Sequence, residues 1–389
     1  MYISPNVTYR PLTQDSAFSW FGYYDKLQVD PTGRFALCMK TTFEGRSPKP
    51  DDILEIGMVD MQNHDEWITL GTTTAWCWQQ GCMLQWIPGS TEWVIWNQRS
   101  GDHFVANLRN VMTDEEIKHP HPIYTLAPDG KTALTTDFRR INDTRPGYGY
   151  CGIVDPWADE LAPEQSGIWK IDLETGESSL ILSIADALRV GKIKTPTKQW
   201  FNHLLVNPDA SRFTWLHRWL AVDEGRGAFE TRMLTANLDG AEIRTIDTSG
   251  HMSHFYWKDA HHLLGYTKPE GQDFHFYLID ERDGSLKVEL DDPRNGHCLY
   301  LPGEHIILND TYPQGPERLQ ELYLYDTHTG KREILGQFPA PKAYTGEWRC
   351  DLHARISPCG TFILFDSAHN CGRKLYRMDI GEAVENLLS

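Results

Sequence analysis

A short motif recurs seven times along this chain of 389 residues, and this repetition constrains the fold more than any other feature. Each copy reads as a short apolar strand, a turn built on Pro, Asp or Gly, and a second strand. Regular internal repeats of this length indicate a repeat architecture. The copies are YDKLQVDPTGRFALCMK (24–40), MLQWIPGSTEWVIWNQ (83–98), YTLAPDGKTALTTDF (124–138), HLLVNPDASRFTWLHRW (203–219), HFYWKDAHHLLGY (254–266), HCLYLPGEHIILND (297–310) and HARISPCGTFILFD (353–366).

Most copies are followed by a further short run with two-residue alternation and a closing turn, such as GIWKIDLETG or LYLYDTHTG, which predicts another hairpin strand. Seven units average about 55 residues (389 divided by seven), a length that suits four-stranded propeller blades with long loops. We therefore predict an all-β fold, a seven-bladed β-propeller in one domain over residues 1–389. The alternative all-β fold, two stacked β-sandwiches, would not produce seven units with the same residue register. A strand near residues 7–9 is expected to pair with the last blade and close the ring.

The repeat spacing is irregular at one place. The turn prolines Pro128 and Pro208 lie 80 positions apart, whereas other neighbouring turns are 40 to 57 positions apart. The excess holds the Gly-, Pro- and aromatic-rich stretch 138–167. A long insertion in a compact fold is usually either functional or disordered, and its aromatic residues favour an ordered loop over the propeller face. One helix is expected, near residues 184–190, with a helical turn at 113–118.

Composition limits the partners. The formal net charge of −17 argues against nucleic-acid binding, because a basic face is the usual electrostatic footprint of such proteins. No apolar run is long enough to cross a membrane, and the N-terminus has no signal-peptide pattern. The eight cysteines form no CxxC pair, which is typical of reduced thiols. We expect a cytoplasmic protein; the sequence does not indicate an oligomeric state. Tryptophan is abundant, with 14 residues, which suits either a β-rich core or the stacking of sugars.

Histidines recur at one register of the repeat. In a propeller the innermost strand of each blade lines the central channel, so residues just before that strand's turn face one shared mouth. Those residues are Asp25, His203, His254, His297 and His353, with Gln79 and Gln80 nearby in the second copy and His121 in the third. Any single histidine could be paired inside its blade, but several at one register indicate metal binding or acid–base chemistry.

Two further clusters carry reactive side chains. In WLHRW, strand alternation places His217 on one face and Arg218 on the other, which suits a base beside an anion-binding arginine. Arg349 and Asp351 form a second pair, in which the arginine captures a carboxylate and the aspartate orients an imidazole or binds metal. Nucleotide-binding, zinc-protease and serine-hydrolase motifs are absent from the sequence.

The blocks FNHLLVNPD, LHRW, SHFYW and DLHARISPCGTFILFDSAH resemble propeller lyases that cleave uronic-acid oligosaccharides, above all the oligogalacturonate lyases. The resemblance implies a divalent metal, usually manganese, with His353 and His254 among its ligands and His217 as the base. The family's closing block has two histidines separated by one residue. In this chain Asp351 takes the first of these positions, so Asp351 or His297 is expected to complete the metal site. Ulvan lyases resemble this chain more distantly and use histidine and tyrosine, which adds Tyr148 and Tyr150 as candidates.

The resemblance implies a lyase that cleaves uronate-containing oligosaccharides by β-elimination. A base, His217 or His203, removes the C5 proton while metal or arginine neutralises the carboxylate, and the C4–oxygen bond then breaks. Arg218 and Arg349 complete the expected catalytic set. Asp25, Gln80, Tyr148 and Tyr150 are expected to bind substrate, and His254, His297, His353 and Asp351 to bind metal. The alternatives are a propeller glycoside hydrolase acting on uronate-linked sugar, or a non-catalytic scaffold of the TolB or WD-repeat kind.

Overall fold

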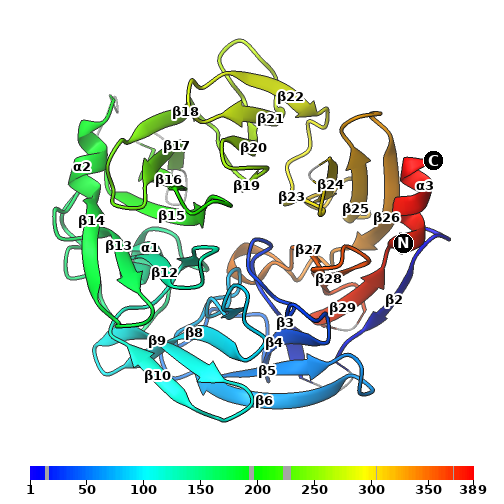
Figure 1. Cartoon of the computed structure of the whole chain (residues 1–389), viewed down its shortest axis with the longest axis horizontal. Coiled ribbons are helices and arrows are strands. Elements are labelled where there is room, and N and C mark those ends of the chain that lie inside the picture. Colours follow the sequence, from blue (N-terminus) through cyan, green and yellow to red (C-terminus); the bar gives the residue numbers. More distant parts are fainter. Residues whose placement is uncertain (14–16, 192–196, 222–228, 304, 371) are drawn as a thin grey trace.

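The structure is a computed structural model that describes residues 1–13, 17–191, 197–221, 229–303, 305–370 and 372–389. The described residues form seven antiparallel sheets, which follow one another around a ring (Figure 1). The seven-bladed β-propeller predicted from the repeats is therefore confirmed. Each blade begins with a short inner strand next to the central channel.

In the described part of the chain each blade has four strands, ordered from the channel to the outer edge, and blade six has a fifth. Blades one to three are β3 (Phe18–Trp20), β4 (Phe35–Thr41), β5 (Leu54–Asp60), β6 (Glu66–Thr73); β7 (Gln85–Trp86), β8 (Trp93–Ser100), β9 (His103–Asn110), β10 (Glu116–His119); and β11 (Thr125–Leu126), β12 (Thr132–Thr136), β13 (Gly167–Asp172), β14 (Ser178–Ser183). Blades four and five are β15 (Gln199–Val206), β16 (Arg212–Leu220), β17 (Phe229–Asn237), β18 (Arg244–Gly250); and β19 (Phe255–Trp257), β20 (His262–Thr267), β21 (His275–Asp280), β22 (Leu286–Leu290). Blades six and seven are β23 (Cys298–Tyr300), β24 (Ile306–Asp310), β25 (Leu319–Asp326), β26 (Arg332–Pro339), β1 (Tyr2–Ile3); and β27 (Arg355–Ile356), β28 (Phe362–Ser367), β29 (Lys374–Asp379), β2 (Thr8–Pro11).

The N-terminus closes the ring, as predicted. Strand β2 pairs antiparallel with β29 and supplies the outer strand of blade seven, with Thr8 opposite Asp379. The preceding strand β1 pairs with β26 as a fifth strand of blade six. Both ends of the chain therefore lie at the same side of the ring (Figure 1). Pairing of the first strand with the last blade covers an edge that would otherwise be open.

The helices differ in part from the prediction. Helix α2 (Ile184–Arg189) lies where it was expected, and a capping box between Ser183 and Asp186 starts it. The helical turn predicted at 113–118 is wrong, because this segment leads into strand β10. Three further helical segments were not predicted. These are α1 (Phe138–Thr144), α3 (Gly381–Leu388) and the 3₁₀ turn η1 (Gly346–Trp348).

The tryptophans mainly fill the core. Seven of them are fully buried, and Trp20, Trp76 and Trp78 pack as one cluster with ring centroids 5.1 to 5.8 Å apart. Large aromatic side chains that interdigitate between sheets are an efficient way to bury apolar area. The burial of these side chains therefore indicates that the tryptophans serve mainly to fill a β-rich core rather than to stack sugars. Among the described residues no helix is long and apolar enough to span a membrane.

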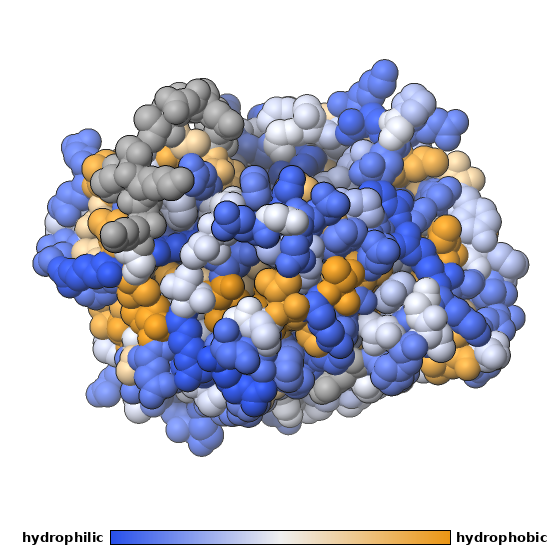
Figure 2. All heavy atoms as spheres, turned by 90° about the horizontal axis from the view of Figure 1, so that it is seen from above, coloured by the Kyte–Doolittle hydropathy of each residue, from blue (hydrophilic) through white to orange (hydrophobic). Residues whose placement is uncertain are grey.

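The outer surface is polar. Seen from the side, hydrophilic residues cover most of the visible face, and apolar residues are scattered between them (Figure 2). The described cysteines form no disulfide, and Cys371 lies outside the described residues. The polar and ionisable groups of greatest interest are instead buried at the centre of the ring, where the first residues of the inner strands meet.

Candidate functional site

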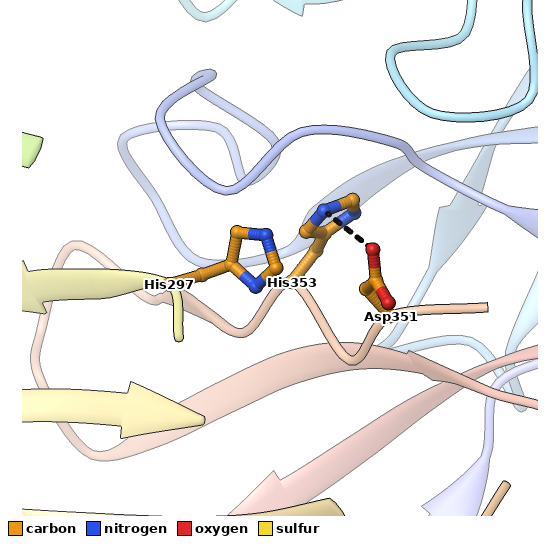
Figure 3. A group of neighbouring side chains, drawn as sticks. All are labelled: His297, Asp351 and His353. Atoms are coloured by element: carbon orange, nitrogen blue, oxygen red, sulfur yellow. Dashed lines mark ion pairs between the residues drawn. The ribbon is translucent and has the colours of Figure 1, made fainter. Parts of the chain in front are cut away.

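Three histidines from successive blades meet at one mouth of the channel. His254 immediately precedes β19, His297 immediately precedes β23, and His353 lies two residues before β27. The ring centroids of His254 and His297 are 4.1 Å apart, and those of His297 and His353 are 4.2 Å apart. Three of the histidines predicted from the register therefore converge, as expected for a shared site. Figure 3 shows His297 and His353 facing each other beside Asp351.

Asp310, at the end of β24, holds two of these histidines in place. One carboxylate oxygen accepts from Nδ1 of His297 at 2.9 Å and from its backbone N–H at 2.8 Å. The other accepts from the backbone N–H of His353 at 2.9 Å. A carboxylate at Nδ1 favours the tautomer with its proton on Nδ1, so Nε2 of His297 carries the free lone pair. Asp310 thereby joins blades six and seven at the site.

His254 is fixed by neutral partners. Its Nδ1 lies 2.9 Å from the side-chain oxygen of Asn295, which again leaves the lone pair on Nε2. Nε2 is 3.4 Å from the hydroxyl of Tyr312, a contact at the long limit of hydrogen bonding. The Nδ1 atoms of His254 and His297 are thus anchored to the protein, and Nε2 of His353 is directed toward Asp351 in the cluster.

Asp351 lies next to His353, and Arg349 and Tyr148 extend the cluster. An oxygen of Asp351 is 3.9 Å from Nε2 of His353 and accepts from Nε of Arg349 at 2.7 Å. The same guanidinium donates through Nη2 to the hydroxyl of Tyr148 at 2.5 Å. Burial lowers the pKa of Arg349, but Asp351 and Tyr148 outweigh it and raise that pKa well above its usual value. Arg349 is therefore a permanent cation at the edge of the site.

Burial keeps the imidazoles of His254 and His353 neutral. It is the largest cause of the lowered pKa of both His254 and His353, and the neighbouring His297 lowers both further. Neutral imidazole is the form that binds metal ions. The backbone of His353 also has a positive φ of 42°, a conformation uncommon outside glycine. Such strained positions are concentrated at functional sites.

The donor set fits a divalent cation. Ligand atoms of His297, Asp351 and His353 all lie within 4.8 Å of one another. The Nε2 atoms of His297 and His353 are buried and have no hydrogen-bond partner. A buried polar atom without a partner is costly, and a cation between these atoms would satisfy both. Mixed imidazole and carboxylate ligands suit zinc, iron and manganese.

A second group of predicted residues lies beside the first. His203 approaches Asp25, with Nε2 3.6 Å from a carboxylate oxygen that also binds Nζ of Lys26 at 3.0 Å. Burial lowers the pKa of His203 to about 4, although Asp25 opposes that shift. Burial alone would raise the pKa of Asp25, but Lys26 and His203 together hold it at about 2. Gln80 is connected to this group through the hydroxyl of Tyr124, which accepts from the Gln80 amide at 2.8 Å and from the backbone N–H of His203 at 2.7 Å.

Arg218 is the most unusual cation near the site. Its guanidinium is buried, donates through Nε to the hydroxyl of Thr231, and forms no ion pair with a described carboxylate. Burial lowers its pKa to about 9, and the nearby charge of Arg145 contributes. Arg218 in turn helps to lower the pKa of His203 and His254, which places its charge close to both groups.

Two predicted residues are placed apart from the others. Both ring nitrogens of His217 are engaged inside blade four: Nε2 lies 2.6 Å from the side-chain oxygen of Gln199 and Nδ1 accepts from Arg232 at 3.0 Å. Tyr150 is buried in the core, where its ring stacks on Phe138 at 4.2 Å and its hydroxyl contacts Asn97. Alternation along β16 explains the difference between neighbours, because it directs His217 and Arg218 to opposite faces of the sheet.

Several residues of the site were not predicted. Tyr23 lies between the two groups, with its ring centroid 4.9 Å from that of His203 and 5.1 Å from that of His353. The position of Asp310 could have been predicted from the sequence. The second strand of a blade runs antiparallel to the first, so it ends at the mouth of the channel where the first strand begins. Tyr23, Tyr24, Asn295 and Tyr312 lie in loops, where the repeat pattern says nothing about side-chain direction.

Comparison with known proteins identifies the fold. No protein-family model and no curated protein sequence matches this chain. Among solved structures, an oligogalacturonate lyase in complex with manganese superposes with a TM-score of 0.70 and 17% identity, covering 97% of this chain and 94% of that one. The oligogalacturonate lyase of Vibrio parahaemolyticus gives 0.69 and 15% identity, covering 98% and 96%. A puromycin-hydrolysing peptidase of Mycobacterium tuberculosis gives 0.54 and 11% identity, covering 92% and 55%.

The resemblance seen in the sequence blocks is thus confirmed for the fold. Both lyases match over nearly the whole length of either chain, and the peptidase matches over little more than half of its own length. At such low identity the likeness establishes the propeller and its blade order. The chemistry of this chain has to be argued from its own side chains.

Proposed function

We propose that this protein is a lyase that cleaves uronate-containing oligosaccharides by β-elimination. The observation that carries the proposal is the convergence of His254, His297 and His353 from three blades, with unpartnered Nε2 atoms on two of them. In a non-catalytic scaffold every buried ring nitrogen of these histidines would be expected to have a hydrogen-bond partner in the protein. In this chain one mouth of the channel gathers imidazoles, a carboxylate and the permanent cation Arg349, which suits the handling of an anionic ligand.

His297, His353 and Asp351 would hold a divalent metal, with His254 next to them. When bound, the cation supplies positive charge that makes a hydrogen adjacent to the substrate carboxylate more acidic. Asp310 orients two ligands, since it binds Nδ1 of His297 and the backbone of His353. Manganese suits this mixed set and is our first choice.

Arg349 is proposed to bind the carboxylate of the reacting uronate. Its Nε and Nη2 are engaged by Asp351 and Tyr148, which fixes the plane of the guanidinium. Nη1 donates to no described residue and is therefore available to a ligand. A guanidinium held on two sides is well suited to receive a planar carboxylate.

We assign the base to Arg218 rather than to His217, whose ring nitrogens are both occupied. A base works best when its pKa is near the working pH. Burial brings the pKa of Arg218 to about 9, whereas that of His203 is about 4. The neutral guanidine takes the C5 proton, the electron pair of the C5–H bond forms the C4=C5 double bond, and the bond from C4 to the glycosidic oxygen breaks. The leaving oxygen keeps the electron pair of that bond and takes up a proton from water, so that it departs as a hydroxyl group. His203 remains the second candidate for this role.

The test is the formation of an unsaturated uronate, followed by its ultraviolet absorbance on a panel of uronate oligosaccharides with manganese added. We expect absorbance to grow with at least one substrate and to require His353. New reducing ends without absorbance would indicate a hydrolase instead. If neither signal appeared with any acidic glycan at saturating metal, the lyase proposal would be wrong.

A further inference from the structure

Two histidines and an aspartate gather at the end of blade six that lies away from the channel mouth. His305 directly precedes β24, Asp326 is the last residue of β25, and His328 lies in the turn that leads to β26. We call these three residues the far-face cluster. Strand β24 runs from this cluster to Asp310 at the mouth, a span of about 17 Å at roughly 3.3 Å per residue. The far-face cluster is therefore separate from the candidate site at the mouth.

The donor atoms of the far-face cluster are close together but not in direct contact. One ligand atom from each of the three residues lies within 4.8 Å of the other two. Among the described residues, neither imidazole forms an ion pair with Asp326. Ligands of one zinc ion, each about 2.1 Å from it, are at most about 4.2 Å apart. A small movement of one side chain would therefore close the cluster around an ion.

The ring of His305 is held in the form that a metal ligand requires. Its Nδ1 lies 3.1 Å from the carbonyl oxygen of Gly303. A carbonyl oxygen can only accept, so Nδ1 carries the proton and the lone pair of the neutral ring is on Nε2. Histidines that bind metal ions are commonly held by a carbonyl group in this way. His305 therefore presents a ligand nitrogen whose orientation is already fixed.

Two of the three ligands are fixed by hydrogen bonds, and the third is adjustable. Thr327 donates its backbone N–H and its hydroxyl to the carbonyl oxygen of His305, both at 2.9 Å. The carboxylate of Asp326 accepts from the hydroxyl of Thr329 at 2.6 Å and from the backbone N–H of His328 at 3.0 Å. The ring of His328 is exposed and stacks on that of His305, with centroids 4.9 Å apart. It makes no hydrogen bond to a described residue, so it can turn toward an ion.

The turn after β25 explains the aspartate but not the two histidines. Asp172, which ends the third strand of blade three, accepts from two backbone N–H groups of its own turn without a histidine nearby in that turn. In blade five, His262 at the start of β20 is paired through Nδ1 with Asp259 at 2.8 Å. The imidazoles of the far-face cluster have no such carboxylate partner among the described residues. Their convergence on one carboxylate is a feature that the turn does not require.

We propose that the far-face cluster binds a zinc ion through Nε2 of His305, a ring nitrogen of His328 and a carboxylate oxygen of Asp326. Imidazole nitrogen and carboxylate oxygen are both common zinc ligands. Each oxygen of Asp326 accepts one hydrogen bond and keeps a further lone pair. Three protein ligands at the surface leave the fourth position to water. The ion would join the turn before β24 to the turn after β25 and thereby stabilise blade six.

The test measures how fast diethyl pyrocarbonate acylates individual histidines, with the products located by mass spectrometry of peptides. The whole protein is saturated with manganese, and zinc is then added. We expect zinc to protect His305 and His328 but not His103, an exposed histidine beside the single carboxylate of Asp102. His305→Ala should raise the zinc concentration that protects His328 about tenfold or more, since loss of even an outer-shell partner has an effect of this size. Zinc should also raise the melting temperature of the wild-type protein more than that of this variant.

An acylation rate of His328 that does not change with zinc would overturn the inference. Equal protection of His103 would overturn it as well, because the zinc would then be bound only adventitiously at the surface. His328→Ala, followed through the protection of His305, repeats the test from the other ligand if His305→Ala is unstable without zinc. The measurement does not depend on turnover, so its outcome is separate from the success or failure of the proposed lyase function.

Discussion

At the scale of single residues, Asp310 is hydrogen-bonded to two of the candidate metal ligands. It fixes the ring of His297 and the backbone of His353 but is not itself in the ligand set. We expect Asp310→Asn to weaken manganese binding about 10- to 100-fold, because the amide cannot accept from both histidines as a carboxylate does. Metal titration followed by calorimetry would measure this change.

The control for this variant is Asp172→Asn, at the exposed end of β13, where the carboxylate accepts from the backbone of the following turn. It should leave metal affinity unchanged. If Asp310→Asn bound manganese as tightly as the wild-type protein, the proposed positioning of His297 and His353 by Asp310 would be incorrect.

Arg218 gives a pH dependence that separates the two candidate bases. The reactive form of Arg218 is the neutral guanidine, which becomes populated as pH rises toward its pKa of about 9. We expect kcat/KM to increase about tenfold per pH unit from neutral pH until it levels off near that value. A His203 base, with a pKa of about 4, would give a flat profile over the same range. Arg218→Lys should abolish the rise.

The register of the repeat predicted the site only in part. It brought His203, His254, His297 and His353 to one mouth, because their distance from the turn of each blade is almost constant. It gave no information on Arg145 or Tyr312, whose loops follow no repeat. The resemblance assigned the base to His217 because the residue types of the LHRW block match the family. Such a match does not say which side chain faces the channel, whereas strand alternation directs His217 and Arg218 to opposite faces of the sheet.

At the scale of elements, the insertion at 138–167 depends on a close contact between its loop and α1. A Cβ atom on Gly149 would lie 2.1 Å from the backbone nitrogen of Asn142 and 2.4 Å from the carbonyl oxygen of Phe138. Gly149→Ala must therefore push the loop away from the helix, at a cost of about 1–3 kcal/mol. We expect weaker substrate binding, because Tyr148 precedes this glycine directly. Initial rates at low substrate would detect the change.

Gly381→Ala is the comparison for this variant, since a Cβ atom there meets nothing within 4 Å. It should leave rates and melting temperature near the wild-type values. Normal low-substrate rates in Gly149→Ala would show that the insertion does not hold the site in place.

The strands were predictable and the short helices were not. Each strand carries a two-residue alternation and a turn, so the sequence contains local evidence for it. Helix α1 has only seven residues and begins with Phe138 directly after a strand, without an extended 3.6-residue pattern. Its position comes from packing of Phe138 against Tyr150, a contact that the sequence does not reveal.

At the scale of the whole molecule, ring closure rests on a few N-terminal residues. Removal of residues 1–11 would leave β29 without its partner β2 and blade seven with three strands. We expect a clearly lower melting temperature and a tendency to aggregate, because the edge of β29 becomes free to pair with other chains. Calorimetry and light scattering would measure both effects.

A shorter truncation provides the control. Removal of residues 1–3 deletes β1 and leaves β2 paired with β29. It should lower the melting temperature much less. Equal melting temperatures for both truncations would show that β2 does not stabilise the ring.

Buried histidines should make the whole molecule sensitive to acid. Burial lowers the pKa of His203 and of His369 to about 4, from an ordinary value of 6.5. The unfolded chain therefore binds more protons between these values, so the stability present above about pH 6.5 falls as pH drops toward 4. Denaturant unfolding across this range should show the decline. The variant His369→Phe, outside the candidate site, should make this loss of stability with falling pH less steep. An unchanged slope would show that burial of His369 does not contribute to the acid sensitivity.

The pairing of β2 with β29 also bears on when the candidate site can form during synthesis. Strands β1 and β2 leave the ribosome before their partners β26 and β29, so they must wait for blades six and seven. Asp351 and His353 belong to that same last blade. A nascent chain that stops short of β29 therefore has neither a closed ring nor a blade to hold these two ligands. Closure of the ring and completion of the candidate metal site therefore depend on the same blade, so a partly made chain has an incomplete set of candidate ligands held in place.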